Sequence, residues 1–149
     1  DDILRQVSVR LSLDLVRMVL DKASFRSRIA TWKQGGQSVL VWGPDGRRMK
    51  LGNFSPGVRG VQHFPLDDRL LSWTWGGFAI IWDAHTGLPL QELRHARRVA
   101  DARVFPRGDR VVVCDWGGEC TVWLSASGAA LVSFSVRNMQ DERSGIFRT

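Results

Sequence analysis

Residues 73–87 read WTWGGFAIIWDAHTG, and residues 114–128 read CDWGGECTVWLSASG. In both stretches a Gly-Gly pair precedes a short run of strand-forming residues that ends in Trp, and a further Gly follows. Residues 32–46, WKQGGQSVLVWGPDG, keep the same order. The Trp residues that end the three runs, Trp42, Trp82 and Trp123, are 40 and 41 residues apart. The chain therefore contains an internal repeat of about 41 residues.

The second and third repeats agree at further positions. Phe64-Pro65 and Asp68-Arg69 recur 41 residues later as Phe105-Pro106 and Asp109-Arg110. Pro, Gly and Asp at these points favour turns, and the Val-rich run at 111–113 favours a strand. We expect four short strands in each repeat, with Gly117-Gly118 as a tight hairpin turn at positive φ. In the third repeat the expected strands are 99–105, 110–116, 119–124 and 129–134.

A four-stranded unit of about 40 residues with Trp at the end of its third strand is typical of a β-propeller blade. Ile81-Trp82-Asp83 with Thr86-Gly87 after it, and the aligned Trp42 and Trp123, resemble the WD-repeat family over roughly residues 15–134. The resemblance implies an all-β fold of antiparallel blades. The repeat Trp is large enough to fill the space between adjacent blades. Trp32 and Trp73 are expected to pack within second strands.

The sequence departs from the family pattern at its polar positions. Only the second repeat has Asp after its Trp, and the family's Gly-His pair survives only as Arg94-His95, where His95 matches the structural histidine. The Asp that the family places in the turn between the second and third strands is replaced by Gly36, Gly76 and Gly117. We therefore expect the buried His–Asp hydrogen-bond network of the family to be absent.

Divided by the repeat length, the chain makes about three blades, which is an open or partial propeller. Residues 1–14 are expected as the outer strand of a neighbouring or closing blade, because 7–13 alternate between apolar and polar residues. Blades are expected at 15–54, 55–95 and 96–135, with 136–149 as a tail or the start of a next blade. Residues 15–20 fall on a first strand, and a short helix is the open alternative.

Three blades do not close a ring, because propellers have roughly four to eight. An open arc exposes one blade face at each end. With an apolar patch of roughly 400 Å² per face, each exposure costs on the order of 10 kcal/mol. We therefore expect either a homo-oligomeric ring or pairing with blades from another chain or from the rest of a longer chain.

The composition is globular, with 149 residues, 44% hydrophobic and 24% charged. The net charge is +6, with 18 Arg and 3 Lys, which favours fixed, forked donors. No membrane span is expected, since the uncharged stretch 70–82 is too short, and the chain does not open on a signal-peptide pattern. Two cysteines, Cys114 and Cys120, are too few for a disulfide framework or a zinc site. We expect reduced thiols on neighbouring strands and a cytoplasmic, intracellular protein.

The titratable residues carry no enzyme signature. His63, His85 and His95 stand in separate contexts without metal-ligand spacing, and the carboxylates are scattered in turns. His85 is expected to be solvated and Asp68 to form a turn. The sequence therefore predicts no catalytic residue, no cofactor and no metal.

A surface is the better functional candidate. In a propeller, the loops that lead into first strands share a face with the turns between second and third strands. That face would carry Trp75, Trp116, Arg94, His95, Arg97 and Arg98. Trp and Arg are enriched at protein-interface hot spots, and they also suit nucleic acid, with Arg on phosphates and Trp stacked on bases. A solvated rim with packed Trp rings is a third interpretation.

The expected function is therefore a non-catalytic protein–protein interaction scaffold or sensor module of the WD-repeat type. The alternative is a nucleic-acid-binding platform that uses the Arg- and Trp-rich loop face. A hydrolase whose site is completed by another chain has no support from the residues.

Overall fold

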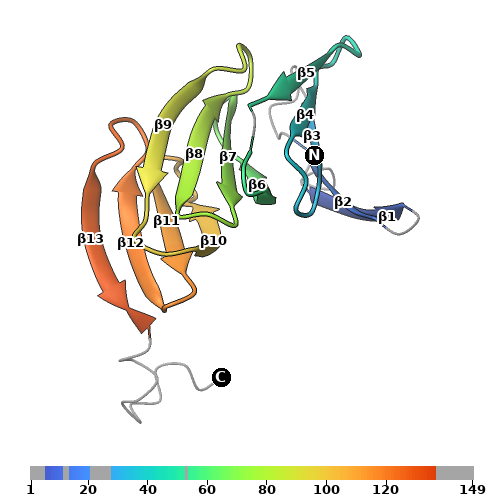
Figure 1. The fold of residues 1–149 in the computed structure, drawn as a ribbon. Coiled ribbons are helices and arrows are strands. Elements are labelled where there is room, and N and C mark those ends of the chain that lie inside the picture. The colour runs from blue at the N-terminus through green and yellow to red at the C-terminus, as the bar shows by residue number, and fades with distance from the viewer. Residues whose placement is uncertain (1–5, 12–13, 21–27, 53, 137–149) are drawn as a thin grey trace.

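The computed structural model describes residues 6–11, 14–20, 28–52 and 54–136, with side chains from Arg28 onward. Every regular element of these residues is a β-strand, and the strands form three antiparallel sheets (Figure 1). The prediction of an all-β fold is confirmed. In the described part of the chain, no helix is long and apolar enough to cross a membrane.

Each sheet is continuous in sequence, and its strands are ordered as they follow in the chain. The first sheet contains β1 (Gln6–Leu11), β2 (Asp14–Leu20), β3 (Ile29–Lys33), β4 (Val39–Trp42) and β5 (Arg48–Leu51). The second contains β6 (Val58–His63), β7 (Arg69–Thr74), β8 (Phe78–Asp83) and β9 (Pro89–Arg94). The third contains β10 (Val99–Val104), β11 (Arg110–Asp115), β12 (Glu119–Leu124) and β13 (Ala130–Ser135).

The strands of the third repeat follow the expected boundaries to within one residue at each end. The strand expected at 15–20 is also present, as β2, and the helix alternative is wrong. The Gly-Gly turns require glycine for two different reasons. Gly118 has φ 86°, as the hairpin turn requires. Gly77 is required for a different reason, because a Cβ there would lie 2.6 Å from the backbone oxygen of His95.

The first strand differs from the sequence prediction. The expectation placed 7–13 in a different sheet from 15–20, but β1 pairs antiparallel with β2 along its whole length, from Gln6 opposite Val19 to Leu11 opposite Asp14. Only two residues separate the two strands, and so short a connection favours pairing as a hairpin. The first sheet therefore has five strands.

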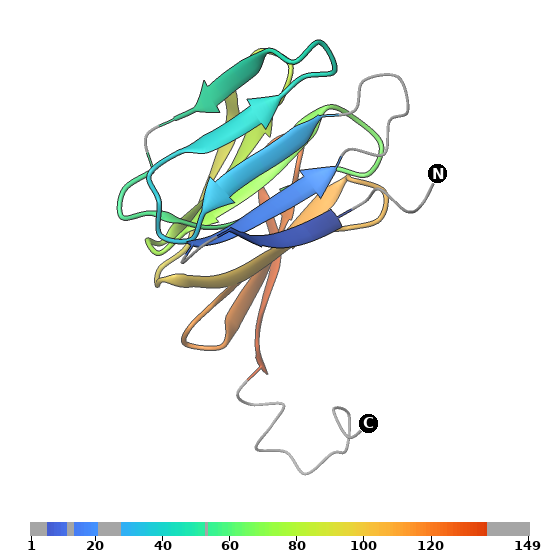
Figure 2. The same cartoon turned by 90° about the vertical axis from the view of Figure 1, so that its right-hand side faces the viewer.

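Two apolar cores lie between the sheets. One core joins the first and second sheets and includes Val41, Leu51 and Leu70. The other joins the second and third sheets and includes Leu71, Ile81 and Val113. Figures 1 and 2 show the three sheets stacked face to face in chain order. The second sheet is thus covered on both faces, and the fully buried Leu70 and Leu71 point to opposite sides of it.

The repeat Trp residues lie on equivalent faces. Trp82 is 5% exposed, belongs to the core with the first sheet and packs edge-on against Phe54 at 5.5 Å between ring centres. A Cβ on Gly52 would lie 2.7 Å from the Trp82 ring, so the chain must pass close to it. Trp123 packs against the core between the second and third sheets. Trp82 and Trp123 thus both lie between adjacent sheets, where the repeat Trp is expected.

Two further Trp residues, on the second strands of their repeats, are also buried. Trp32 and Trp73, in β3 and β7, are 4% and 5% exposed, as predicted.

The first strands of the repeats come together, because β6 contacts β2 and β3 on one side and β10 on the other. The sheets fan outward from these strands, toward β5, β9 and β13 (Figure 1).

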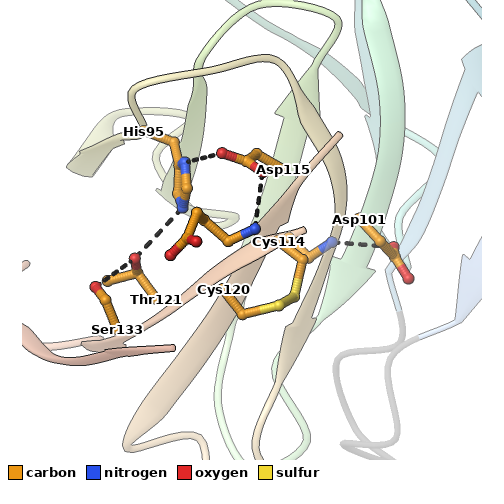
Figure 3. Close-up of a disulfide and its surroundings, with 9 residues drawn as sticks. His95, Asp101, Cys114, Asp115, Cys120, Thr121 and Ser133 are labelled. Atoms are coloured by element: carbon orange, nitrogen blue, oxygen red, sulfur yellow. Dashed lines mark hydrogen bonds and ion pairs between the residues drawn. A yellow bond between two sulfur atoms is a disulfide. The ribbon is translucent and has the colours of Figure 1, made fainter. Parts of the chain in front are cut away.

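The prediction of two reduced thiols is wrong. Cys114 and Cys120 form a disulfide between β11 and β12 (Figure 3). The two residues are register partners, with Cα atoms 4.1 Å apart. That register cannot be read from the spacing of the cysteines alone. Because disulfides persist mainly in oxidising environments, the prediction of a cytoplasmic location loses the observation on which it rested.

Candidate functional site

Trp75 and Trp116 occupy equivalent turns on one side of the molecule. Each residue follows the second strand of its sheet, and each donates its backbone N–H to the residue just before the first strand of that sheet. The acceptors are Gly57 for Trp75, at 3.1 Å, and Arg98 for Trp116, at 3.0 Å. Trp116 is 56% exposed and Trp75 is half-buried. Trp116 therefore presents a large apolar ring to solvent.

Arg59, on β6, connects the two indoles. Its guanidinium carbon lies over the Trp75 ring, 4.3 Å from the ring centre, and over the Trp116 ring at 5.1 Å. Its Nε donates to the backbone oxygen of Ala100 at 2.8 Å. A guanidinium over an aromatic face gains cation–π attraction. Arg59 thus joins the second and third sheets and brings the two predicted Trp residues into one cluster.

Irregular strand pairing explains why Arg59 and Ala100 meet. The register of β6 with β7 shifts between Val58 and Gly60, so Arg59 is the additional residue. The register of β10 with β11 shifts at the equivalent place, between Val99 and Asp101, which leaves Ala100 outside the ladder. A bulge re-aims its extra residue and leaves that residue unpaired. One bulge therefore supplies the arginine and the next supplies the carbonyl.

A cleft of about 240 Å³ adjoins Arg59 along the first strands of the repeats. It is lined by residues of all three sheets: Trp32, Gln34, Arg59, Gly60, Val61, Trp73, Ala100, Asp101 and Arg103. A Cβ on Gly60 would overlap the Trp73 indole, so this glycine makes room for the ring. Arg103 lies over the same ring at 5.8 Å and pairs with Asp101 at 3.2 Å. The lining thus carries two guanidinium groups and one carboxylate.

The expectation that no His–Asp hydrogen-bond network forms holds for the hydrogen bond itself, because His95 Nδ1 has no hydrogen-bond partner among the described residues, but the two side chains do meet in the third sheet. His95 Nδ1 lies 3.3 Å from Asp115 Oδ2, and His95 Nε2 lies 3.3 Å from Thr121 Oγ1 (Figure 3). Thr121 Oγ1 is 2.8 Å from Ser133 Oγ. Asp115, the last residue of β11, supplies this carboxylate from a position two residues before Gly117, and its Oδ1 accepts the backbone N–H of Glu119.

A carboxylate, an imidazole and a hydroxyl in contact, as in Asp115, His95 and Thr121, also occur in acyl-transfer enzymes. Here the burial of the three side chains favours a structural role. The side chains of His95 and Asp115 are 6% and 1% exposed, and Thr121 is buried. The Thr121 hydroxyl is already engaged between His95 and Ser133. A buried cluster of polar side chains in contact with one another fixes local structure. Here it anchors the connection after β9 to β11, β12 and β13.

Of the other predicted surface residues, the three arginines are exposed and the histidine is buried. Arg97 and Arg98 are exposed beside the Trp116 turn. Arg94 is exposed at the end of β9 and pairs with Glu92 at 2.8 Å. His95 is turned inward and is not available to a partner. The structure therefore brings Trp75, Trp116, Arg97 and Arg98 to one area, with Arg59 added.

Sequence reasoning missed Arg59, Asp101 and Arg103. Val58 and Val99 align at 41 residues, but the repeat does not mark the residue that follows each Val as a bulge. Arg59 stands exactly one repeat before its acceptor, Ala100. This 41-residue offset is the one signal in the sequence that connects the two residues. It indicates a contact only once the pairing of the strands is known.

A second polar cluster lies between the first two sheets. Arg28 Nε donates to both carboxylate oxygens of Asp68, at 2.8 and 2.9 Å, and Arg28 Nη2 contacts His85 Nδ1 at 3.0 Å. The Arg28 side chain is 11% exposed. Asp68 was expected as a turn former only, but it also holds the first two sheets together. His85 is exposed, as predicted.

The described residues contain no group of three or more His, Cys, Asp or Glu that could hold a metal ion. The chain matches no known family model, and no curated protein matches it.

Proposed function

We propose that this chain is a segment of a WD-type β-propeller that acts as a non-catalytic protein-interaction scaffold. The proposal is supported most by the shared construction of the two inter-sheet cores. In each, a sheet with a repeat Trp packs on the preceding sheet, Trp82 on the first and Trp123 on the second. The 41-residue repeat and the meeting of β6 with β10 are consistent with blades around a common axis.

The third sheet has an outer face that belongs to neither core. Val111 and Val113 pack on the second sheet, so Val112 and Cys114 point the other way. Their register partners on β12 and β13 lie on the same face: Cys120, Val122, Val132 and Phe134. Val132 and Phe134 are 53% and 41% exposed. This outer face is apolar, apart from Arg110 on β11 and the residues of β10.

The first sheet has the complementary outer face. Trp42 lies there, opposite Ile29, and its Nε1 donates to Thr31 Oγ1 at 3.2 Å. Trp82 makes the matching bond to Ser72 at 2.8 Å on the face that packs on the first sheet. The Trp42 face thus has the chemistry of a face that packs on a preceding sheet. The occupant that fits it is the outer face of the third sheet in a second copy of this chain.

The test is association after a charge is placed on one outer face. Phe134→Asp should reduce the mass measured by light scattering to that of a single chain, because it buries a carboxylate in the contact. Leu66→Asp is the matched control, since Leu66 is 73% exposed in the turn after β6 and lies on neither face. Equal masses for the two variants would contradict docking through this face. Association only with a longer form of the chain would assign the face to further blades.

Exposed Arg94, Arg97 and Arg98 favour a second candidate function, a nucleic-acid-binding platform. Binding through phosphate contacts weakens steeply as salt rises. Fluorescence anisotropy with a labelled single-stranded oligonucleotide across a salt series tests this. Absence of binding at low salt would remove the candidate.

A further inference from the structure

Arg59 is a partly buried cation held in one position. The backbone oxygen of Ala100 fixes its Nε, and two indoles lie against its guanidinium. Among the described residues, no carboxylate pairs with it, whereas Arg103 in the same cleft already pairs with Asp101. Taking a cation partly out of water without a counter-ion is unfavourable. The arrangement therefore favours an anion supplied from outside.

The guanidinium can still bind such an anion through its terminal nitrogens. Nε is engaged, and the four N–H groups on the two Nη atoms form a planar fork that matches a carboxylate. Because the indoles and the carbonyl hold the fork in place, little side-chain freedom is lost on binding. The adjoining cleft of about 240 Å³ has room for a side chain beside the fork.

The same contacts disfavour single-stranded nucleic acid at this position. Bases bind such proteins by stacking on aromatic faces, and Arg59 already lies over a face of both Trp75 and Trp116. Asp101 also lines the cleft, and its carboxylate would repel a continuous run of phosphates. A single carboxylate that meets Arg59 is less affected.

We propose that the Arg59 cleft binds a Glu or Asp side chain of an acidic peptide segment in a partner protein. The proposal deepens the scaffold function and rests on it, because it names the chemistry of the partner. Exposed Trp116, Arg97 and Arg98 then flank the bound segment, and their charges favour neighbouring acidic residues.

The experiment is a binding titration by fluorescence anisotropy with the purified chain. The probe is a labelled peptide of alternating Glu and Gly, and the matched peptide has Gln in place of Glu. The Glu peptide should bind, and the Gln peptide should bind at least about tenfold more weakly, because charge-assisted hydrogen bonds are lost. Equal binding of the two peptides, or binding of neither, would overturn the proposal without use of a variant.

Variants then locate the site. Arg59→Gln should weaken binding of the Glu peptide about tenfold, and Arg59→Lys should restore only part of it, because the charge returns without the fork. Arg107→Gln is the control, an exposed arginine in the turn at the opposite end of β11. Circular dichroism checks that each variant is folded. An unchanged affinity in folded Arg59→Gln would contradict the assignment.

Two outcomes separate this proposal from others. Binding of a single-stranded oligonucleotide that depends on Arg59, without binding of the Glu peptide, would replace it with the nucleic-acid candidate. A chain that binds the Glu peptide through Arg59 but stays monomeric would keep the acidic partner and contradict docking between copies. A chain that forms an oligomer but binds no acidic peptide would support docking between copies and contradict the acidic partner.

Discussion

Single residues differ in how much they contribute to the packing between sheets, and Trp82 contributes much. Its ring is 5% exposed, closes against Phe54 and Gly52, and donates to Ser72. Trp116 is of the same type but is 56% exposed and contacts Arg59. The same type of side chain is therefore buried between sheets at one position and exposed to solvent at the other.

We predict that Trp82→Ala lowers the free energy of unfolding by about 3–5 kcal/mol, because it leaves a cavity between two sheets. Trp116→Ala should lower it by about 0.5 kcal/mol or less, as expected of an exposed site. Urea denaturation followed by circular dichroism measures both. Equal losses for the two variants would show that the Trp116 ring is part of the core and would remove the motivation for a binding surface there.

Asp83 gives the turn after β8 a dependence on pH. Burial raises the pKa of its carboxyl, but hydrogen bonds from the backbone N–H groups of His85 and Thr86 outweigh burial and lower the pKa below 3.8. The carboxylate therefore stabilises the fold above that value, and the stabilisation is lost as the pH falls through the lower pKa of the folded chain.

Asp83→Asn should accordingly be less stable than the unchanged chain at about pH 7, and the difference should shrink as the pH falls below the ordinary carboxyl range. Urea denaturation of both proteins over that range measures it. A difference that stays constant with pH would mean that the charge of Asp83 does not stabilise the turn.

At the scale of elements, the sequence predicts the strands well because Gly, Pro and Asp interrupt them at regular intervals. The strand over 119–124 agrees at both ends. Contacts that depend on how strands pair were not predictable. The disulfide requires Cys114 and Cys120 to be register partners, Arg59 requires a bulge, and His95 contacts a carboxylate two residues from its expected place.

The disulfide closes a short hairpin that carries Trp116 at its turn. Replacing both cysteines with Ala should lower stability by roughly 2 kcal/mol, the chain-entropy value for so small a loop. The fold should persist, because four further register pairs join β11 to β12 beside the cysteine pair. Thermal unfolding with and without reductant measures the effect for the unchanged chain and for the double variant. No response of the unchanged chain to reductant would contradict a stabilising disulfide.

At the scale of the whole molecule, the repeat explains the stack of sheets and leaves its ends open. The second sheet is covered on both faces, whereas the first and third each have one outer face outside the two cores. The sequence indicated the number of repeats through Trp42, Trp82 and Trp123. It could not indicate the pairing of β1 with β2, because alternating residues fit an edge strand in either sheet.

The solution mass of the unchanged chain tests the central claim, that the two outer faces pack on each other between copies. Light scattering after size exclusion, at micromolar concentration, gives this mass directly. Docking between copies predicts a single species at a whole multiple of 16.8 kDa, with two chains as the smallest closed ring. A folded, monodisperse species of 16.8 kDa would contradict it.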